Sequence, residues 1–252
     1  MGVGKGRWVW LGVLVAGAAL AVACAEAKPP PASVAAGGKL YDKWWSVVSG
    51  AQEPKDNQAL WALQDTNKRT GPDTWRCKEC HGWDYKGKDG AYGSGSHKTD
   101  FVGIYDAATK KSAKELADIL KGAKNPKHNF ASLLGEENIT NLANFLKAGV
   151  IDMTPNIDYS TKKPKSANAT KGKELFDKNC ASCHGNDGKK LNFGTQQAPE
   201  YVGTLAKDNP QEFLHKVRSG QPGAPMPSAF EQGWSLQDVV DILAHAQTLP
   251  EK

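Results

Sequence analysis

Two short motifs hold the residues whose type and spacing could do chemistry. Each has two cysteines with two residues between them and a histidine directly after the second cysteine, in CKECH at residues 77–81 and in CASCH at residues 180–184. Three chemistries use such a cysteine pair: a zinc site, a dithiol redox centre and the covalent attachment of haem c. The added histidine and the distance between the motifs separate these alternatives.

The spacing favours haem attachment. Zinc sites commonly take two cysteine pairs from nearby sequence, whereas 100 residues separate Cys80 from Cys180. A thioredoxin-like dithiol is typical of a βαβ context, and the sequence around the motifs lacks the alternation of strands. In haem c, each cysteine sulfur bonds one vinyl group and the next histidine ligates the iron. The predicted residues are Cys77, Cys80 and His81 for haem one, and Cys180, Cys183 and His184 for haem two.

The chain repeats one helical unit around the two motifs. KLYDKWW at residues 39–45 resembles ELFDKNC at residues 174–180. Downstream of each motif, apolar residues recur with the i, i+3, i+4, i+7 spacing of an amphipathic helix. Ser235 with Asp238 approximates a capping box at the start of the second of these helices. The two apolar stripes are Ile139, Leu142, Ala143 and Leu146, and Leu236, Val239, Val240 and Leu243.

The second unit resembles a class I cytochrome c domain. The resemblance rests on CASCHGNDG, on GKELFDKNC before it, and on GQPGAPMPSAF and a final helix after it. The first unit shares the cysteine motif and the closing helix, and carries a large Trp/Gly-rich insertion before its motif. The whole chain is similar to a tandem dihaem cytochrome c. The resemblance implies an all-α fold of two haem domains and a role in electron carriage.

The resemblance also implies a second axial ligand for haem two. Class I cytochromes usually supply a methionine from the loop before the last helix. Met226 stands in that place between two prolines, which stiffen a loop. We therefore expect Met226 to ligate haem two, and we expect His215, from a helix, to pack near the same haem.

The repeat predicts the second ligand of haem one. Met226 precedes the stripe residue Leu236 by ten residues, and His128 precedes its counterpart Ile139 by eleven. His128 therefore occupies the corresponding position in the first unit, and a neutral imidazole is a common iron ligand. The alternatives that remain open are His97, in a Gly-rich loop, and Met153, after the closing helix.

The amino-terminal segment predicts export. A short basic start precedes the apolar run from Trp8 to Ala23, which is the layout of a secretory signal peptide. An uncleaved membrane anchor is the alternative, although the run is short for a spanning helix. Cys24 follows in LAVACA, which resembles a lipoprotein lipobox, so Cys24 is either a lipidation site or removed by ordinary cleavage. The Pro-rich residues 24–36 then suit a tether.

The charge balance gives no sign of nucleic-acid binding. The leader contributes Lys5 and Arg7 and no acid, so its removal lowers the formal net charge from +5 to +3. Basic and acidic residues are interspersed, without the basic stripe that a nucleic-acid interface needs. We expect redox proteins as partners instead.

These observations predict an exported, periplasmic dihaem electron relay rather than an enzyme. A bis-His haem one would have the lower potential and a His/Met haem two the higher. The alternatives are a dihaem enzyme of the peroxidase or thiosulfate-oxidising type, and a dedicated cytochrome subunit of an oxidoreductase complex. In each case, Cys24 or the uncleaved amino-terminal anchor could tether the protein to a membrane. The predicted parts are a leader at 1–23, a tether at 24–36, haem domain one at 37–158, a linker at 159–168 and haem domain two at 169–252.

Overall fold

The computed structural model describes residues 1–4 and 27–252, so the predicted leader and Cys24 lie outside the described residues. The described part of the chain is mostly helical, as predicted. Within it, the two short strands β1 (Ile157–Asp158) and β2 (Lys163–Pro164) pair in an antiparallel sense. Over the same residues, no helix has the length and apolar character needed to cross a membrane.

Eleven α-helices form the described fold. They are α1 (Pro31–Lys43), α2 (Cys77–His81), α3 (Tyr105–Lys110), α4 (Ala113–Leu120), α5 (Ala131–Ala148), α6 (Ala169–Asn179), α7 (Ala181–His184), α8 (Val202–Asp208), α9 (Pro210–Ser219), α10 (Ala229–Gln232) and α11 (Leu236–Ala246). Short 3₁₀ turns are η1 (Trp44–Ser46), η2 (Trp61–Leu63), η3 (Gly71–Trp75), η4 (Ala91–Gly93), η5 (Gly95–His97) and η6 (Pro126–His128).

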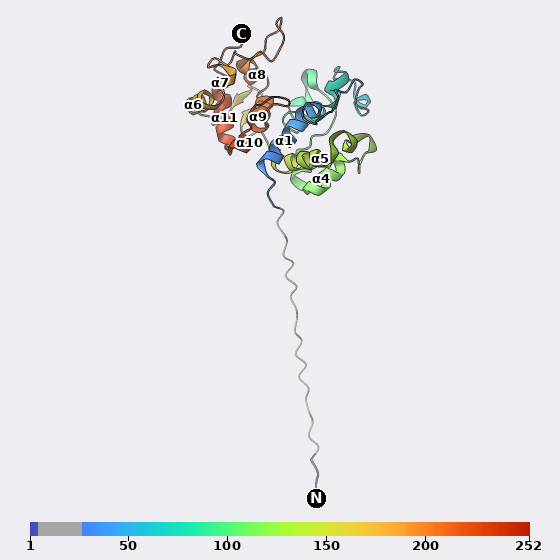
Figure 1. Ribbon diagram of the computed structural model, residues 1–252. Helices are drawn as coiled ribbons and strands as arrows, with labels where there is room; N and C mark the ends of the chain where they lie inside the picture. Colours follow the sequence, from blue (N-terminus) through green and yellow to red (C-terminus); the bar gives the residue numbers. More distant parts are fainter. Residues whose placement is uncertain (5–26) are drawn as a thin grey trace.

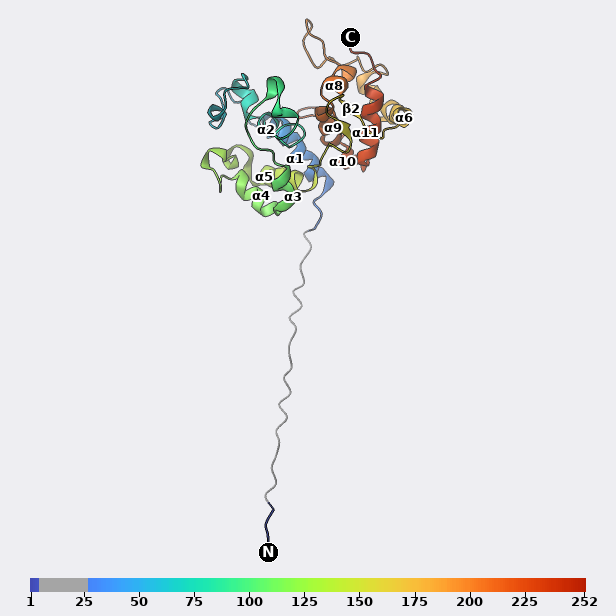
Figure 2. The same ribbon diagram turned by 180° about the vertical axis from the view of Figure 1, so that it is seen from behind.

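The helices form two lobes. Helices α2 to α5 make the first lobe and α6 to α11 the second, with α1 between them (Figures 1 and 2). Helix α1 packs along α5 and also contacts α9 and α10. A single cluster of buried apolar side chains runs through both lobes. The two lobes therefore share one hydrophobic core.

A close helix crossing closes each lobe, with α1 against α5 and α6 against α11. Gly37 on α1 lies against the backbone carbonyl of Asn141, and Gly172 on α6 lies against that of Asp241. A Cβ atom at either glycine would overlap the facing carbonyl. Both crossings therefore need a residue without a side chain.

The closing helices bury the predicted stripes. Helix α5 buries Ile139, Leu142, Ala143 and Leu146, and it has a kink at Gly135, whose φ is 72°. Helix α11 begins at Leu236, after the capping box formed by Ser235 and Asp238. The sequence therefore predicted the start of α11 and its cap correctly.

The segment expected as a linker is tied to the second lobe. Within residues 159–168, the backbone carbonyl of Lys162 accepts a hydrogen bond of 2.8 Å from Nε2 of Gln247. The Lys162 ammonium in turn donates to the carbonyl of Asp208 at 2.7 Å. Lys163 and Pro164 of this segment form strand β2 of the short hairpin.

Candidate haem-binding sites

The two cysteine motifs have the same local backbone. Each ends a short helix, α2 or α7, at a glycine in the left-handed region, with φ 78° at Gly82 and 80° at Gly185. Gly82 N–H donates to the carbonyl of Lys78 at 2.8 Å, and Gly185 N–H donates to that of Ala181 at the same distance. Glycine adopts this conformation without steric cost. It turns the chain sharply after each histidine.

The turn that follows the histidine has the same hydrogen bond in both motifs, but one of its residues differs between them. The carbonyl of His81 accepts from Gly87 N–H, and that of His184 accepts from Lys190 N–H, both at 2.9 Å. Three residues after the first turn glycine stands Tyr85, with φ 66°, where the second unit has Gly188 with φ 72°. A side chain in this region costs about 1–2 kcal/mol. Tyr85 is therefore held in a conformation that its counterpart adopts freely.

The imidazole rings of His81 and His128 lie close together in the first lobe. His128 ends the turn η6, and the centres of the two imidazole rings lie 6.2 Å apart at an interplanar angle of 74°. The turn is fixed by Gln58, which donates to the carbonyl of Lys127 at 2.9 Å, and by Phe130 N–H, which donates to the Leu120 carbonyl at 2.9 Å. Pro126 forms part of η6, so the chain there is the turn that the proline predicted.

A hydrogen bond orients His81. Its Nδ1 lies 2.7 Å from the carbonyl oxygen of Val102. Because a carbonyl can only accept, Nδ1 carries the proton and Nε2 keeps its lone pair for a metal. Burial lowers the pKa of His81 to about 4 and also lowers the pKa of His128. Both rings are therefore neutral near pH 7, the state that binds metal.

The ring separation fits two imidazoles on one metal ion. With metal–nitrogen distances of about 2 Å and about 1 Å from each nitrogen to its ring centre, two ligands on opposite sides would have ring centres about 6 Å apart. The observed 6.2 Å agrees with this value. Cys77 and Cys80 lie on the same short helix as His81. The donor set therefore fits a haem held by His81 and His128.

The two alternative ligands of the first unit are engaged elsewhere. Nδ1 of His97 lies 3.1 Å from a carboxylate oxygen of Glu79, and its Nε2 lies 3.0 Å from the Arg69 guanidinium. Its ring stacks on Tyr92 with centres 4.6 Å apart. Met153 is fully buried in the apolar core. These contacts account for both residues without a metal.

The second motif is arranged more openly. His184 is partly buried, and burial lowers its pKa. Its Nδ1 has no hydrogen-bond partner among the described residues, and its ring packs on Phe193 with centres 5.7 Å apart. Met226 lies in the segment between α9 and α10 and packs, half-buried, against the core. It thus precedes the last helix, as expected, but the short helix α10 lies between its loop and α11.

The four motif cysteines are free thiols. Burial raises the pKa of Cys77 to about 12 and that of Cys180 to about 11, whereas dithiol redox centres use thiols of lowered pKa. Within residues 1–4 and 27–252, no group of three or more His, Cys, Asp or Glu side chains is placed to hold a metal ion. Neither a redox dithiol nor a zinc site therefore matches the geometry.

A buried carboxylate lies behind the first motif. Glu79, between the two cysteines, is fully buried. Its carboxylate accepts from Lys78 at 2.5 Å, Asn67 at 2.9 Å and His97 at 3.1 Å, and it pairs with Arg69 at 3.4 Å. Burial alone would raise the pKa of Glu79, but the His97 hydrogen bond and the Lys78 charge lower it. The insertion is thereby bound to the haem motif.

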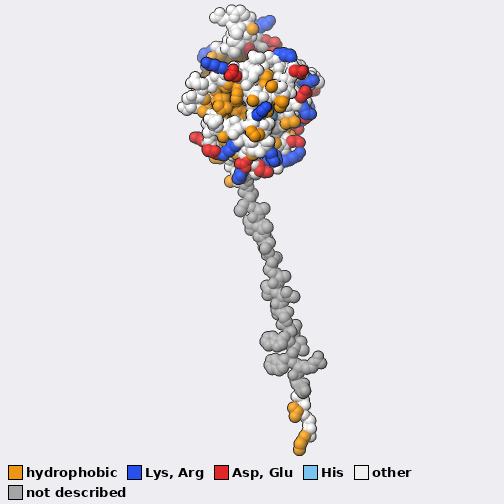
Figure 3. Space-filling view, turned by 90° about the vertical axis from the view of Figure 1, so that its right-hand side faces the viewer, with side chains coloured by type: hydrophobic (Ala, Val, Ile, Leu, Met, Phe, Trp, Pro, Cys, Tyr) orange, Lys and Arg blue, Asp and Glu red, His pale blue; other side chains and the backbone are white. Residues whose placement is uncertain are grey.

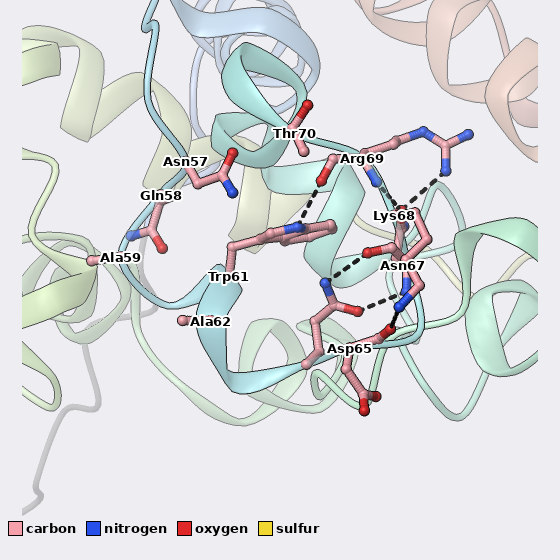
Figure 4. Close-up of a pocket in the computed structure, with 11 residues that line it drawn as sticks. Asn57, Gln58, Ala59, Trp61, Ala62, Asp65, Asn67, Lys68, Arg69 and Thr70 are labelled. Atoms are coloured by element: carbon pink, nitrogen blue, oxygen red, sulfur yellow. Dashed lines mark hydrogen bonds between the residues drawn. The ribbon is translucent and has the colours of Figure 1, made fainter.

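Residues of the insertion also line an open pocket of about 420 Å³ (Figure 4). Trp61 donates from its indole nitrogen to the carbonyl of Arg69 at 2.9 Å, and Gln64 and Asn67 bond to one another across its edge. The pocket lies beside the Glu79 cluster, and its lining includes none of the predicted haem residues. The lining residues are Asn57, Gln58, Ala59, Trp61, Ala62, Gln64, Asp65, Asn67, Lys68, Arg69 and Thr70.

Sequence reasoning missed the seam, which we define as the contact of Asp42, Arg76 and Trp83–Tyr85 with α9. The buried carboxylate of Asp42 on α1 bonds to Arg76, the residue before the first cysteine, and accepts from Lys216 on α9 at 2.7 Å. Burial would raise the pKa of Asp42, but the charges of Lys216 and Arg76 lower it. The seam therefore links the first haem motif to the second lobe.

His215, which the sequence reading placed near haem two, lies in this seam and contacts residues of α1 and the first lobe. It is fully buried, and its ring packs on Trp83 with centres 4.9 Å apart. The sequence placed His215 on a helix correctly, but its partners come from the first lobe. His215 shares its face of α9 with Gln211, Arg218 and Ser219, which are also buried, so no hydrophobic pattern in the sequence revealed what it would contact.

The surface carries mixed charge. On the face shown in Figure 3, Lys and Arg side chains alternate with Asp and Glu side chains around a central group of apolar ones. This agrees with the absence of a basic stripe in the sequence.

Comparison with known proteins places this site in a class. The family described as cytochrome c oxidase, cbb3-type, subunit III, matches residues 167–245. These residues hold the second cysteine motif and Met226, and they form a cytochrome c domain similar to that subunit. Domains of this class carry covalently bound haem c and transfer electrons.

Similar full-length proteins are cytochrome bc1 complex cytochrome c subunits from Mycobacterium bovis and Mycobacterium tuberculosis. Each is 24% identical over 181 residues, which cover 69% of this chain and 60% of the relative. The chain therefore matches only about three fifths of the length of these relatives. The similarity extends beyond the length of the domain at residues 167–245.

Proposed function

We propose that the chain is an exported dihaem cytochrome c that relays electrons between redox partners. The first unit would hold haem one through Cys77 and Cys80, with His81 and His128 as axial ligands. The second unit would hold haem two through Cys180 and Cys183, with His184 and Met226 as axial ligands. The proposed domain bounds, 37–158 and 169–252, are those predicted from the sequence, although helix α1 begins at Pro31, within the stretch predicted as a tether.

The observation that carries the proposal is the pairing of His81 with His128. Their 6.2 Å ring separation suits two ligands of one iron, in a unit that also has the Cys-x-x-Cys-His motif. The close similarity of the two motif backbones supports a second haem in the same chain. Haem supplies the one-electron couple.

The ligand sets support a direction of transfer. A thioether stabilises the reduced iron more than an imidazole does, and axial ligands tune haem potentials over about 0.8 V. The first unit would therefore have the lower potential and the second the higher. The chain would accept an electron at its first lobe and pass it on from its second.

The ligand variants test this proposal. His128→Ala should convert haem one from low-spin to high-spin or water-ligated iron while both haems stay covalently attached. His97→Ala is the matched control, since both its ring nitrogens are bonded elsewhere, and it should leave the low-spin signal unchanged. Low-temperature EPR measures the spin state of each haem iron, and haem staining of a denaturing gel measures covalent attachment. Loss of the bis-His signal in the His97 variant alone would contradict the assignment.

A second candidate is a dedicated subunit of an oxidoreductase complex. Its support is the similarity to cytochrome c subunits of bc1 complexes. Co-purification of the native protein with membrane subunits would favour this function, and recovery as a free periplasmic protein would favour the independent relay. Peroxide or thiosulfate turnover by the isolated protein would instead favour the dihaem enzymes considered above.

A further inference from the structure

Tyr85 occupies a turn position at which the second unit of the repeat has a glycine. The second unit has Gly188 there with nearly the same left-handed φ, and the first unit keeps the same turn with a tyrosine. Tyrosine in this region is strained and persists only when its surroundings hold it. The side chain of Tyr85 must therefore make a contact that the second unit does not need.

That contact is with His215 of the second lobe. The Tyr85 hydroxyl lies 2.9 Å from Nδ1 of His215, and Nε2 of His215 lies 3.0 Å from the carbonyl of Gly38. Because the carbonyl can only accept, Nε2 carries the proton and Nδ1 accepts from the tyrosine. Tyr85 and His215 are both fully buried. One tautomer thus satisfies all three polar groups.

The Tyr85–His215 pair also contacts Trp83, which lies two residues after His81. The Trp83 ring packs on His215, and three cations lie over it, at 5.3 Å for Lys78, 5.4 Å for Lys216 and 5.9 Å for Arg76. These charges oppose removal of an electron from the indole. Trp83 therefore packs between the units without itself being oxidised.

We propose that Tyr85 and His215 are a positioning pair that holds the first haem-binding motif against the second unit and so fixes the separation across which the two units exchange electrons. The proposal rests on the proposed dihaem function. In each exchange one unit loses one electron and the other gains it. Tyr85, Trp83 and His215 keep their protons and electrons throughout. Burial lowers the pKa of His215 to about 3, so it adds no charge to the seam at neutral pH.

The test compares variants of the full chain. His215→Phe keeps a ring of similar size and removes both hydrogen bonds, whereas His215→Gln keeps one donor and one acceptor. His245→Phe is the matched control, because His245 is also a buried histidine of the second lobe but packs on Phe176 away from the seam. Pulsed reduction gives the rate of electron exchange between the units, and EPR gives the ligation of each haem.

We expect His215→Phe to lose most of the exchange rate, His215→Gln to recover part of it, and His245→Phe to match the wild type. All should keep both sets of EPR signals. Equal exchange rates in His215→Phe and His245→Phe would overturn the proposal. If His215→Phe fails to accumulate, Tyr85→Phe replaces it in the test, because this change removes only the donor hydroxyl. A lower exchange rate in Tyr85→Phe would support the proposal, and a rate equal to that of His245→Phe would overturn it.

The same measurements on the wild type separate this proposal from the proposed function. Absence of a second covalent haem or of a bis-His signal would refute the dihaem function before any variant is made. Two haems with the expected ligation, but unchanged exchange in the seam variants, would refute the positioning pair alone.

Discussion

Removing the carboxylate of Asp42 should destabilise the whole protein, because it leaves two cations without their anion in the seam. Asp42 is 1% exposed, and the side chains of its partners Arg76 and Lys216 are only 19% and 14% exposed. Removing one member of a buried ion pair costs about 3–5 kcal/mol. Arg76 keeps its hydrogen bond to the backbone carbonyl of residue 42 and a weak contact with Asp73, and Lys216 keeps a 2.7 Å hydrogen bond to Gln221 and an ion pair with Glu212. We therefore expect the lower end, about 3 kcal/mol.

Thermal unfolding measures this loss. For a chain of this size, about 3 kcal/mol corresponds to a decrease in Tm of roughly 6–12 °C. Asp118→Ala is the control, since Asp118 pairs with Lys114 on an exposed helix surface, and it should leave Tm unchanged. A single transition is expected because the lobes share a core. An Asp42→Ala variant with the wild-type Tm would refute our account of the seam.

The pH dependence gives a second check on the same residue. The folded state lowers the pKa of Asp42, so its contribution to stability is complete above the ordinary aspartate value of about 3.9. It is lost as the pH falls through the folded-state value. The difference in Tm between wild type and Asp42→Ala should therefore shrink below about pH 4. A difference that stays constant to lower pH would show that the carboxylate charge is not its source.

Three further predictions address the second unit and the leader. Met226→Ala should abolish the weak red charge-transfer band of Fe(III)–Met coordination in the oxidised protein, and a surviving band would exclude Met226 as the ligand. Gly172→Ala should lower the free energy of unfolding by about 1–3 kcal/mol, measured by denaturant titration, because its methyl group would overlap the Asp241 carbonyl. Cys24→Ser should move a lipidated protein from the membrane fraction to the soluble periplasm, and an unchanged distribution would support cleavage or an uncleaved anchor instead.

The sequence predicted those elements that depend on interactions between residues close together in the chain. The stripes of α5 and α11 and the capping box at Ser235 depend on residues three or four apart, so they could be predicted from the sequence. The cysteine motifs were visible for the same reason. Met226 was expected before the last helix and lies there, but the sequence reading did not include the short helix α10 between Met226 and α11.

The seam could not be predicted in this way. Tyr85 and His215 are 130 residues apart, and Asp42 and Lys216 are 174 apart. Their contact depends on how α1 packs against both lobes, which no short pattern encodes. The sequence did contain one usable signal, the tyrosine that replaces a turn glycine of the repeat. Its meaning appears only once the left-handed φ of both residues is known.

The helix alignment used in the spacing argument for His128 differs from the alignment in the structure by about one helical turn. The glycine crossings pair Asn141 with Asp241, which aligns Ile139 with Val239 rather than with Leu236. That register is three residues from the one assumed in the sequence, close to one turn of about 3.6 residues. A stripe repeats after one turn, so pattern alone could not distinguish the two registers.

In the register of the crossings, His128 lies eleven residues before its aligned helix position and Met226 lies thirteen before its own. The two loops thus differ by two residues, and equal spacing cannot be what brings His128 to His81. The bonds of Gln58 to Lys127 and of Phe130 to Leu120 hold the turn there instead. Gln58 belongs to the insertion that the second unit lacks. The insertion therefore helps to place His128, the proposed ligand that distinguishes the first unit from the second.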